Sequence, residues 1–269
     1  MARPPQSDAP APNDAHAAST AAPSSRAPEA PLAGISPKGR RIGRWIRWVF
    51  YAVLLLVIGF HLWVVAELWW WRTHNPPVTA FMEQGLDRLR EKNPRAQLEQ
   101  QWVPYERISV HLKRAVIAAE DQKFLGHEGF DWEAIENSYQ RNQARRRVSR
   151  GGSTISQQLA KNLFLTAQRS YLRKGEEAVI TLLVEGVLGK RRILEIYLNV
   201  IEWGNGIYGA EAAARHYFGT SAAQLSPEQA ARLAAMIPNP RYFDRRRDSP
   251  YLDRRTQTLL PYLPMMAVP

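Results

Sequence analysis

The sequence predicts a mainly α-helical domain preceded by one membrane-spanning helix. Three observations support this prediction in a chain of 269 residues. A long uncharged apolar stretch lies near the N-terminus, as in membrane spans. Apolar residues recur at helical spacing through the rest of the chain, and no segment sustains the alternation typical of strands.

Residues 1–37 are predicted to form a disordered cytoplasmic tail. They contain 8 prolines and 11 alanines and no aromatic residue. Such a segment cannot bury enough apolar surface to offset the entropy lost on ordering.

Residues 38–71 are predicted to hold a basic flank and the membrane-spanning helix. Residues 48–66 contain no Asp, Glu, Lys or Arg, and at about 1.5 Å per residue they nearly cross a hydrocarbon core of roughly 30 Å. Five Lys or Arg residues lie in the 20 residues before this stretch and one in the 20 after it. The positive-inside rule therefore places the N-terminus in the cytoplasm. A cleaved signal peptide is the alternative, but its apolar region is usually shorter, about 7–15 residues.

Residues 72–269 are predicted to form a single extracytoplasmic domain of helices. Ser109 is placed as the N-cap of a helix whose apolar residues follow helical spacing: Leu112, Ala115, Val116 and Ala119. Residues 175–188 are apolar nearly all round, as in a buried helix, and residues 193–198 predict another short helix.

A further helix is predicted to begin at Ser226. Pro227 suits its first position, and Gln229 completes a capping box with Ser226. Pro238 ends this helix. Residues 245–269 are expected to be peripheral and weakly ordered.

Composition limits the function. The chain has no cysteine, which excludes disulfides, thiol catalysis and cysteine metal sites. Its net charge of +11 is compatible with nucleic-acid binding. Because the domain is predicted to lie outside the cytoplasm, the expected partner is anionic lipid or a lipid-linked phosphate. Nucleic acid is not expected to bind.

The first candidate site is Glu120-Asp121. Glu120 lies eight residues after Leu112 and continues the apolar stripe of its helix. Burial disfavours the charged carboxylate, so the pKa of Glu120 is expected to rise toward that of a usable base. The alternative is a helix-end carboxylate bonded to a loop. His127 is expected to bond the backbone of its own loop.

The second candidate site is residues 151–162, where a glycine pair and two hydroxyls open a helix. The free N–H groups at such a start favour anions. Polar side chains would extend this donor surface: Ser153, Gln157, Gln158, Lys161 and Asn162. Gln157 and Lys161 share one helical row, and Gln158 and Asn162 share the next. Lys161 and Arg169 could hold a pyrophosphate. An ordinary amphipathic helix with a solvated face is the alternative.

The third candidate is an acid at the start of the buried helix, in Arg173-Lys174-Gly175-Glu176-Glu177. A charge inside an apolar helix is costly unless it is paired, and Lys161 or Arg169 would be suitable partners. Helical periodicity does not choose between Glu176 and Glu177.

Together these motifs resemble the monofunctional biosynthetic peptidoglycan transglycosylases of glycosyltransferase family 51. The resemblance runs in order from about Val103 to Pro240 through five blocks: residues 118–131, 151–165, 173–177, 193–199 and 206–219. It implies a lysozyme-like helical lobe with a small membrane-proximal jaw. It also implies polymerisation of lipid II into glycan strands, with inversion of the donor anomeric carbon and release of undecaprenyl pyrophosphate.

The resemblance also implies roles for residues. Glu120 would be the general base. The family's Arg-Lys-x-x-Glu spacing selects Glu177 as the second carboxylate, which assists departure of the pyrophosphate or orients its cations. Lys161 and Arg169 would neutralise the leaving group. The remaining candidates would bind substrate phosphate and sugar: Asp121, Ser153, Gln157, Gln158 and Asn162.

The implied partners are lipid II, lipid-linked glycan, membrane lipids and other cell-wall synthesis proteins. The implied location is the bacterial inner membrane, with the catalytic domain in the periplasm. No protein metal site is expected, although a divalent cation such as Mg²⁺ could bridge the substrate pyrophosphate. The chain departs from the family pattern at Gly189, where Ser is usual. The five arginines in residues 141–150 are expected either to be solvated or to contact anionic lipid.

Two rival functions have distinct requirements. A hydrolase or lytic transglycosylase needs an acid that protonates a sugar leaving group, not cations for pyrophosphate. A catalytically silent scaffold has no need of Glu120, Glu177 and Lys161 together. A bifunctional penicillin-binding protein is not expected, because no Ser-x-x-Lys or Lys-Thr-Gly motif occurs and few residues follow the last block.

Overall fold

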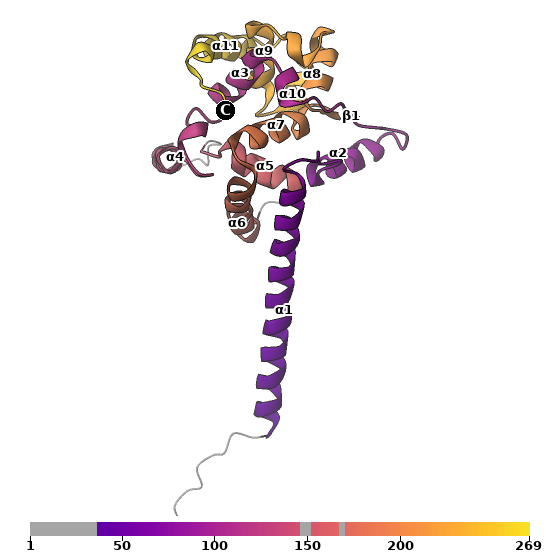
Figure 1. The fold of residues 1–269 in the computed structure, drawn as a ribbon, viewed down its shortest axis with the longest axis vertical. Helices are drawn as coiled ribbons and strands as arrows, with labels where there is room; N and C mark the ends of the chain where they lie inside the picture. The colour runs from indigo at the N-terminus through magenta and orange to yellow at the C-terminus, as the bar shows by residue number, and fades with distance from the viewer. Residues whose placement is uncertain (1–36, 146–151, 167–169) are drawn as a thin grey trace, which may run out of the picture. The chain divides into compact units, whose positions relative to one another are not determined.

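The computed structural model describes residues 37–145, 152–166 and 170–269. The described chain is mainly α-helical, which confirms the predicted fold class. The chain divides into two compact units, residues 1–52 and 53–269. Figure 1 shows the order of the helices by colour. The second unit holds every candidate site residue that the structure describes.

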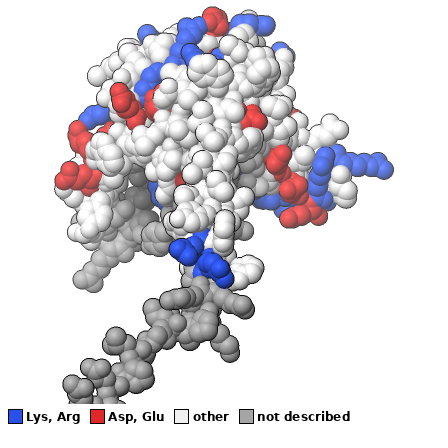
Figure 2. All heavy atoms as spheres, turned by 60° about the horizontal axis from the view of Figure 1, so that its bottom comes forward, with Lys and Arg blue, Asp and Glu red and all other residues white. Residues whose placement is uncertain are grey.

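The long N-terminal helix α1 spans Pro37–Trp70. Its part from Arg44 to Trp70 is long and apolar enough to cross a membrane. Lys or Arg side chains lie where the described side chains of this helix begin (Figure 2). Val64 and Leu68, by contrast, are fully buried in the core of the second unit. The last turns of α1 therefore pack with the domain that sequence analysis began at residue 72.

The second unit consists mainly of helices packed on one another, with one small sheet. Its elements up to the second candidate site are α2 (Ala80–Arg90), β1 (Glu99–Gln100), η1 (Tyr105–Arg107), α3 (Val110–Glu120), η2 (Phe124–Gly126) and α4 (Trp132–Arg145). Those that carry or follow that site are α5 (Ile155–Phe164), α6 (Tyr171–Leu188), α7 (Lys190–Val200), β2 (Glu202–Gly204), β3 (Ile207–Tyr208) and α8 (Ala210–Phe218). The last are η3 (Ala222–Gln224), α9 (Pro227–Met236), α10 (Pro240–Asp244), α11 (Pro250–Leu259) and η4 (Leu260–Met265).

Two groups of helices position the site. In the first, α9 packs against both α3 and α11, and these three helices lie side by side in Figure 1. In the second, α5 packs against α6 and α7. The sheet has the order β1-β3-β2, in which β1 is parallel and β2 antiparallel to β3. Sequence analysis did not foresee these two- and three-residue strands, because they are too short to show alternation.

Local sequence signals set several helix ends. The Ser109 hydroxyl accepts a hydrogen bond from the His111 N–H and caps α3, as predicted. Ser226 and Gln229 form the predicted capping box of α9. The expectation for residues 245–269 is wrong, because they form α11 and η4. Apolar side chains anchor both elements in the core: Leu252, Leu259 and Leu263.

Gly209 joins β3 to α8 in a conformation that other residues rarely adopt. Its φ is +84°, and a Cβ there would lie 2.7 Å from the carbonyl oxygen of Asn199. We expect Gly209→Ala to lower the free energy of unfolding by about 1–3 kcal/mol, measured by thermal unfolding in detergent. The control is Gly186→Ala in α6, where a Cβ meets nothing within 4 Å, so stability should hold or rise. An unchanged melting temperature for Gly209→Ala would contradict this account of the turn.

Candidate active site

Glu120 is the last residue of α3, and its carboxylate is partly buried. Its Oε2 accepts a hydrogen bond of 2.8 Å from the amide Nε2 of Gln158 on α5. Burial raises the pKa of Glu120, whereas the Gln158 hydrogen bond and the charges of Arg255 and Lys161 oppose the rise. The predicted upward direction of the pKa shift of Glu120 is confirmed. Glu120 therefore has the character of a base that can both hold and release a proton.

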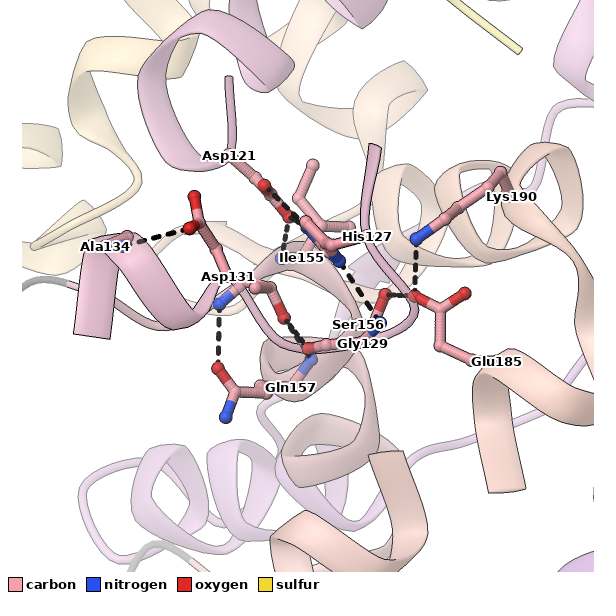
Figure 3. A network of polar contacts seen from close by, with 11 residues as sticks. Asp121, His127, Gly129, Asp131, Ala134, Ile155, Ser156, Gln157, Glu185 and Lys190 are labelled. Atoms are coloured by element: carbon pink, nitrogen blue, oxygen red, sulfur yellow. Dashed lines mark hydrogen bonds and ion pairs between the residues drawn. The ribbon is translucent and has the colours of Figure 1, made fainter. Parts of the chain in front are cut away.

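Asp121 connects the end of α3 to the start of α5. Its Oδ2 accepts a 2.9 Å hydrogen bond from the Ile155 N–H, and its Oδ1 lies 2.9 Å from Nε2 of His127 (Figure 3). His127 Nδ1 accepts from the Gly129 N–H, so Nε2 carries the proton that is donated to Asp121. Both carboxylate oxygens of Asp121 are thus engaged within the protein. Asp121 thereby holds the loop against α5. His127 bonds within its own loop, as predicted.

Side chains at the start of α5 bond the first backbone N–H groups of the helix. Thr154 accepts from the Gln157 N–H, and Gln157 Oε1 accepts from the Thr154 N–H at 3.0 Å. Thr154 also donates to the carbonyl of Gly129 at 2.7 Å. The N–H groups of Ile155 and Gln157 therefore have acceptors within the protein. Gln157 is buried in this capping box, and its Oε1 holds the start of the helix.

The exposed side chains of α5 are not those of either predicted row, Gln157 with Lys161 or Gln158 with Asn162. Gln158 and Lys161, three residues apart, are both partly exposed, whereas Asn162 is buried. Ser153 is exposed immediately before the helix. Arg169 lies outside the residues that the structure describes, as does most of the arginine-rich segment 141–150. The predicted buried side of α5 is confirmed by Ile155, Leu159 and Leu163.

Lys161 lies within electrostatic reach of both candidate acids. Burial lowers the pKa of its ammonium group, and the positive charges of Arg173 and Lys174 lower it further. Glu177 and, more weakly, Glu120 oppose this shift. The hydrogen bond from Gln158 to Glu120 and the packing of α5 against α6 bring the motifs of α3, α5 and α6 to one site.

Glu177 is the buried acid of α6. Only 4% of its surface is exposed, whereas Glu176 is partly exposed. The structure thus resolves the choice that periodicity left open. Glu177 Oε2 lies 3.1 Å from Nη1 of Arg173, and Oε1 forms an ion pair with Lys174. Both of these partners come from the same helix. Of the two predicted partners, Lys161 interacts with Glu177 through its charge, and Arg169 lies outside the residues that the structure describes.

A second polar contact holds α5 against α6 and α7. Glu185 Oε1 accepts from the Ser156 hydroxyl at 2.5 Å and from Nζ of Lys190 at 2.7 Å (Figure 3). Gly189, which lies between α6 and α7, has φ +62°. Glycine adopts this conformation without strain, which gives the departure from the family's usual serine a physical reason.

Sequence reasoning missed two residues of the site. Arg255 of α11 lowers the pKa of Glu120 through its charge, and its buried Nε has no hydrogen-bond partner among the described residues. Tyr197 of α7 donates to Oε1 of Gln158 at 2.9 Å. Tyr197 falls in a block that resembles the family, but no role was inferred for it. Arg255 falls in the segment that was expected to be peripheral.

The Asp121 contacts give a stability prediction. In Asp121→Asn, the amide group can accept from only one of the two donors, Ile155 N–H and His127. We expect a loss of about 1–3 kcal/mol in unfolding free energy, because a buried donor is left without a partner. The control is Asp253→Asn, whose side chain is 57% exposed; its stability should change little. Thermal unfolding of both variants in detergent measures the difference, and equal effects would contradict the role of Asp121.

Comparison with known proteins identifies the family of this chain. Residues 87–263 match the family model described as Transglycosylase. The chain is 58% identical over 228 residues to the biosynthetic peptidoglycan transglycosylase of Dechloromonas aromatica (strain RCB), covering 85% of this chain and 99% of that protein. It is 57% identical over 213 residues to the protein of the same name from Herminiimonas arsenicoxydans, covering 79% and 92%. The family match and these identities show that the chain belongs to the transglycosylase family.

Proposed function

We propose that the chain is a peptidoglycan glycosyltransferase that polymerises lipid II into glycan strands. The proteins it resembles are named biosynthetic peptidoglycan transglycosylases. The observation that carries the proposal is Lys161, a partly buried cation that interacts with both Glu120 and Glu177. A base such as Glu120 suits attack by a hydroxyl, because it accepts the hydroxyl proton. A cation such as Lys161 suits departure of an anion, because it stabilises the negative charge that develops.

The proposed step transfers a growing glycan to a new sugar. The 4-hydroxyl of a lipid II sugar attacks the anomeric carbon of the lipid-linked glycan from the face opposite the pyrophosphate. The new glycosidic bond forms as the bond from that carbon to the phosphate oxygen breaks, which inverts the anomeric carbon. Glu120 accepts the proton of the attacking hydroxyl. The bond electrons leave with undecaprenyl pyrophosphate.

Cations stabilise the leaving group in this scheme. Lys161 is proposed to meet the pyrophosphate, with Arg169 assisting it. Glu177 pairs with Arg173 and Lys174, which supports a role in orienting those cations. The other residues proposed to bind phosphate and sugar are Asp121, Ser153, Gln157, Gln158 and Asn162. A divalent cation such as Mg²⁺ would arrive with the pyrophosphate that chelates it, since the described residues hold no cluster of three or more acidic or histidine ligands.

Membrane association follows from α1 and the family. We propose that α1 crosses the bacterial inner membrane once, with the N-terminus in the cytoplasm and the catalytic unit in the periplasm. The support is the excess of cations before the apolar stretch. Membrane lipids and other cell-wall synthesis proteins are the further partners that this location implies.

The rival functions fit the site less well. A glycan hydrolase has to protonate a sugar leaving group, yet the second acid here is already paired with Arg173 and Lys174. A catalytically silent scaffold would not need Glu120, a carboxyl whose pKa is raised by burial, next to the Gln158 amide that donates a hydrogen bond to it.

Purified full-length protein supplied with lipid II tests the proposal. We expect lipid-linked glycan strands that separate by size on a gel and release of undecaprenyl pyrophosphate. The protein should leave mature glycan intact. Cleavage of mature glycan without polymerisation of lipid II would identify a hydrolase and overturn the proposal.

A further inference from the structure

We propose that Tyr197 is a positioning residue for Glu120: its hydroxyl fixes the Gln158 amide so that the amide N–H donates to the carboxylate. Three elements contribute one side chain each to this relay. Tyr197 on α7 donates to Oε1 of Gln158 at 2.9 Å, and Nε2 of Gln158 on α5 donates to Oε2 of Glu120 at 2.8 Å. The inference rests on the proposed function, in which Glu120 is the base.

The orientation of the amide matters because its two ends have opposite roles. An ionised carboxylate only accepts hydrogen bonds, whereas a protonated carboxyl can donate one. With its N–H toward Glu120, Gln158 favours the ionised form that acts as base. With its oxygen toward Glu120, the same amide would favour the neutral form. The two orientations thus shift the protonation of Glu120 in opposite directions.

Tyr197 favours the orientation in which the Gln158 N–H points toward Glu120. Its side chain is fully buried, and Gln158 Oε1 is the acceptor that the structure gives its hydroxyl. If the amide turned over, the hydroxyl proton would face an N–H group and lose this acceptor, which is costly in the interior. The contact of Tyr197 with Gln158 therefore opposes the orientation that favours neutral Glu120.

Tyr197 remains a donor throughout the working pH range. Burial, together with the nearby negative charges of Glu120 and Asp121, raises its pKa well above that of an ordinary tyrosine. The charged groups that act on Glu120 itself are Arg255 from α11, Lys161 from α5 and the adjacent Asp121. Substitution of the Tyr197 hydroxyl leaves all three of these charges in place, so an effect on Glu120 can be assigned to the relay.

The test is the pH dependence of lipid II polymerisation by Tyr197→Phe. Glu120 must be ionised to act, so activity falls on the acidic side as Glu120 takes up a proton. We expect this acidic limb to move toward higher pH by about half a unit to one unit, the shift that matches one net hydrogen bond. The rate on the plateau above the limb should be retained.

Tyr208→Phe is the matched control. Tyr208 is also buried, but its hydroxyl donates to the carbonyl of Phe81 at 3.3 Å, and the charges that act on it are Glu202, Arg241 and Arg88. The acidic limb of the pH dependence of polymerisation by Tyr208→Phe should coincide with that of the wild type. A shift as large as that of Tyr197→Phe would mean that loss of any buried hydroxyl has this effect, and it would overturn the proposal.

A double-variant comparison shows whether Tyr197 acts through Gln158. Gln158→Ala alone should move the acidic limb in the same direction, and adding Tyr197→Phe should move it no further. The single variant Gln158→Ala keeps the proposal testable even if Tyr197→Phe does not fold. An unshifted limb in Gln158→Ala, or in a folded Tyr197→Phe, would overturn it. Failure of the wild type to polymerise lipid II would instead refute the proposed function.

Discussion

Glu120→Gln is expected to abolish glycan polymerisation while the protein remains folded. Glutamine matches the shape of the side chain but cannot accept the proton of the attacking hydroxyl. General bases typically contribute about 10²–10⁴-fold to the rate, and we expect a loss of this size in turnover of lipid II. The Gln158 amide that donates to Glu120 at 2.8 Å can donate equally to the oxygen of the new amide.

The stability of this variant follows from the sign of the pKa shift. Burial raises the pKa of Glu120 in the folded protein. Between the ordinary glutamate pKa and this raised value, the folded state holds the proton more tightly than the unfolded state. Folding stability therefore falls as the pH rises through that window. Above the window the buried charge is a cost that Glu120→Gln removes, so its melting temperature at neutral pH should equal or exceed that of the wild type.

Glu106→Gln is the control for this prediction. Its side chain is 65% exposed and pairs with Arg191, so the same chemical change is made away from the site. This control should polymerise lipid II normally. Retained turnover in Glu120→Gln would remove Glu120 from the role of base, whatever the result for Glu106→Gln.

Lys161→Ala is expected to weaken binding of pyrophosphate-bearing substrate much more than it changes stability. A charge-assisted contact contributes about 1.5–3 kcal/mol, so kcat/KM should fall by roughly 10- to 100-fold. Folding should tolerate the change, because burial already disfavours the ammonium group and lowers its pKa. Glu177 keeps its ion pairs with Arg173 and Lys174 in this variant. Substrate binding and thermal unfolding, measured on the same preparation, separate the two effects.

Lys123→Ala is the matched control for Lys161→Ala. Its side chain is 53% exposed and pairs with Glu133, so it removes one lysine charge without touching the site. Substrate affinity should be unchanged in this control. Equal affinity in Lys161→Ala and the wild type would contradict the assignment of Lys161 to the pyrophosphate.

Local features of the fold could be predicted from the sequence because their causes lie within a few residues. Ser109 and Ser226 cap their helices as predicted, and each bonds an N–H two or three residues away. The position of Glu120 on an apolar stripe indicated its burial and the direction of its pKa shift. A helical period was sufficient for each of these predictions.

The polar contacts of the site could not be predicted in this way. The Ile155 N–H that Asp121 binds lies 34 residues further along the chain, and Gln158 lies 38 residues after Glu120. Sequence spacing carries no information on such partners, so Asp121 and Gln157 were interpreted as contacts for substrate. The structure shows that both carboxylate oxygens of Asp121 and the Oε1 of Gln157 are bonded within the protein.

The C-terminal segment shows a different cause of error. Leu252 and Leu259 lie seven residues apart and Leu263 four further on, which is a helical stripe. Two arginines and one proline lie between these leucines and gave the segment a polar appearance. The stripe buries α11 against α9, and α11 carries Arg255, whose charge acts on Glu120.

The most direct test of the central claim is a structure of Glu120→Gln bound to a lipid-linked disaccharide pyrophosphate and an acceptor sugar. The claim is that one site presents the attacking hydroxyl to residue 120 and the leaving pyrophosphate to Lys161. We expect the acceptor hydroxyl within hydrogen-bond distance of residue 120 and the pyrophosphate in contact with Nζ of Lys161. A pyrophosphate bound elsewhere, or an acceptor hydroxyl that does not reach residue 120, would contradict the account.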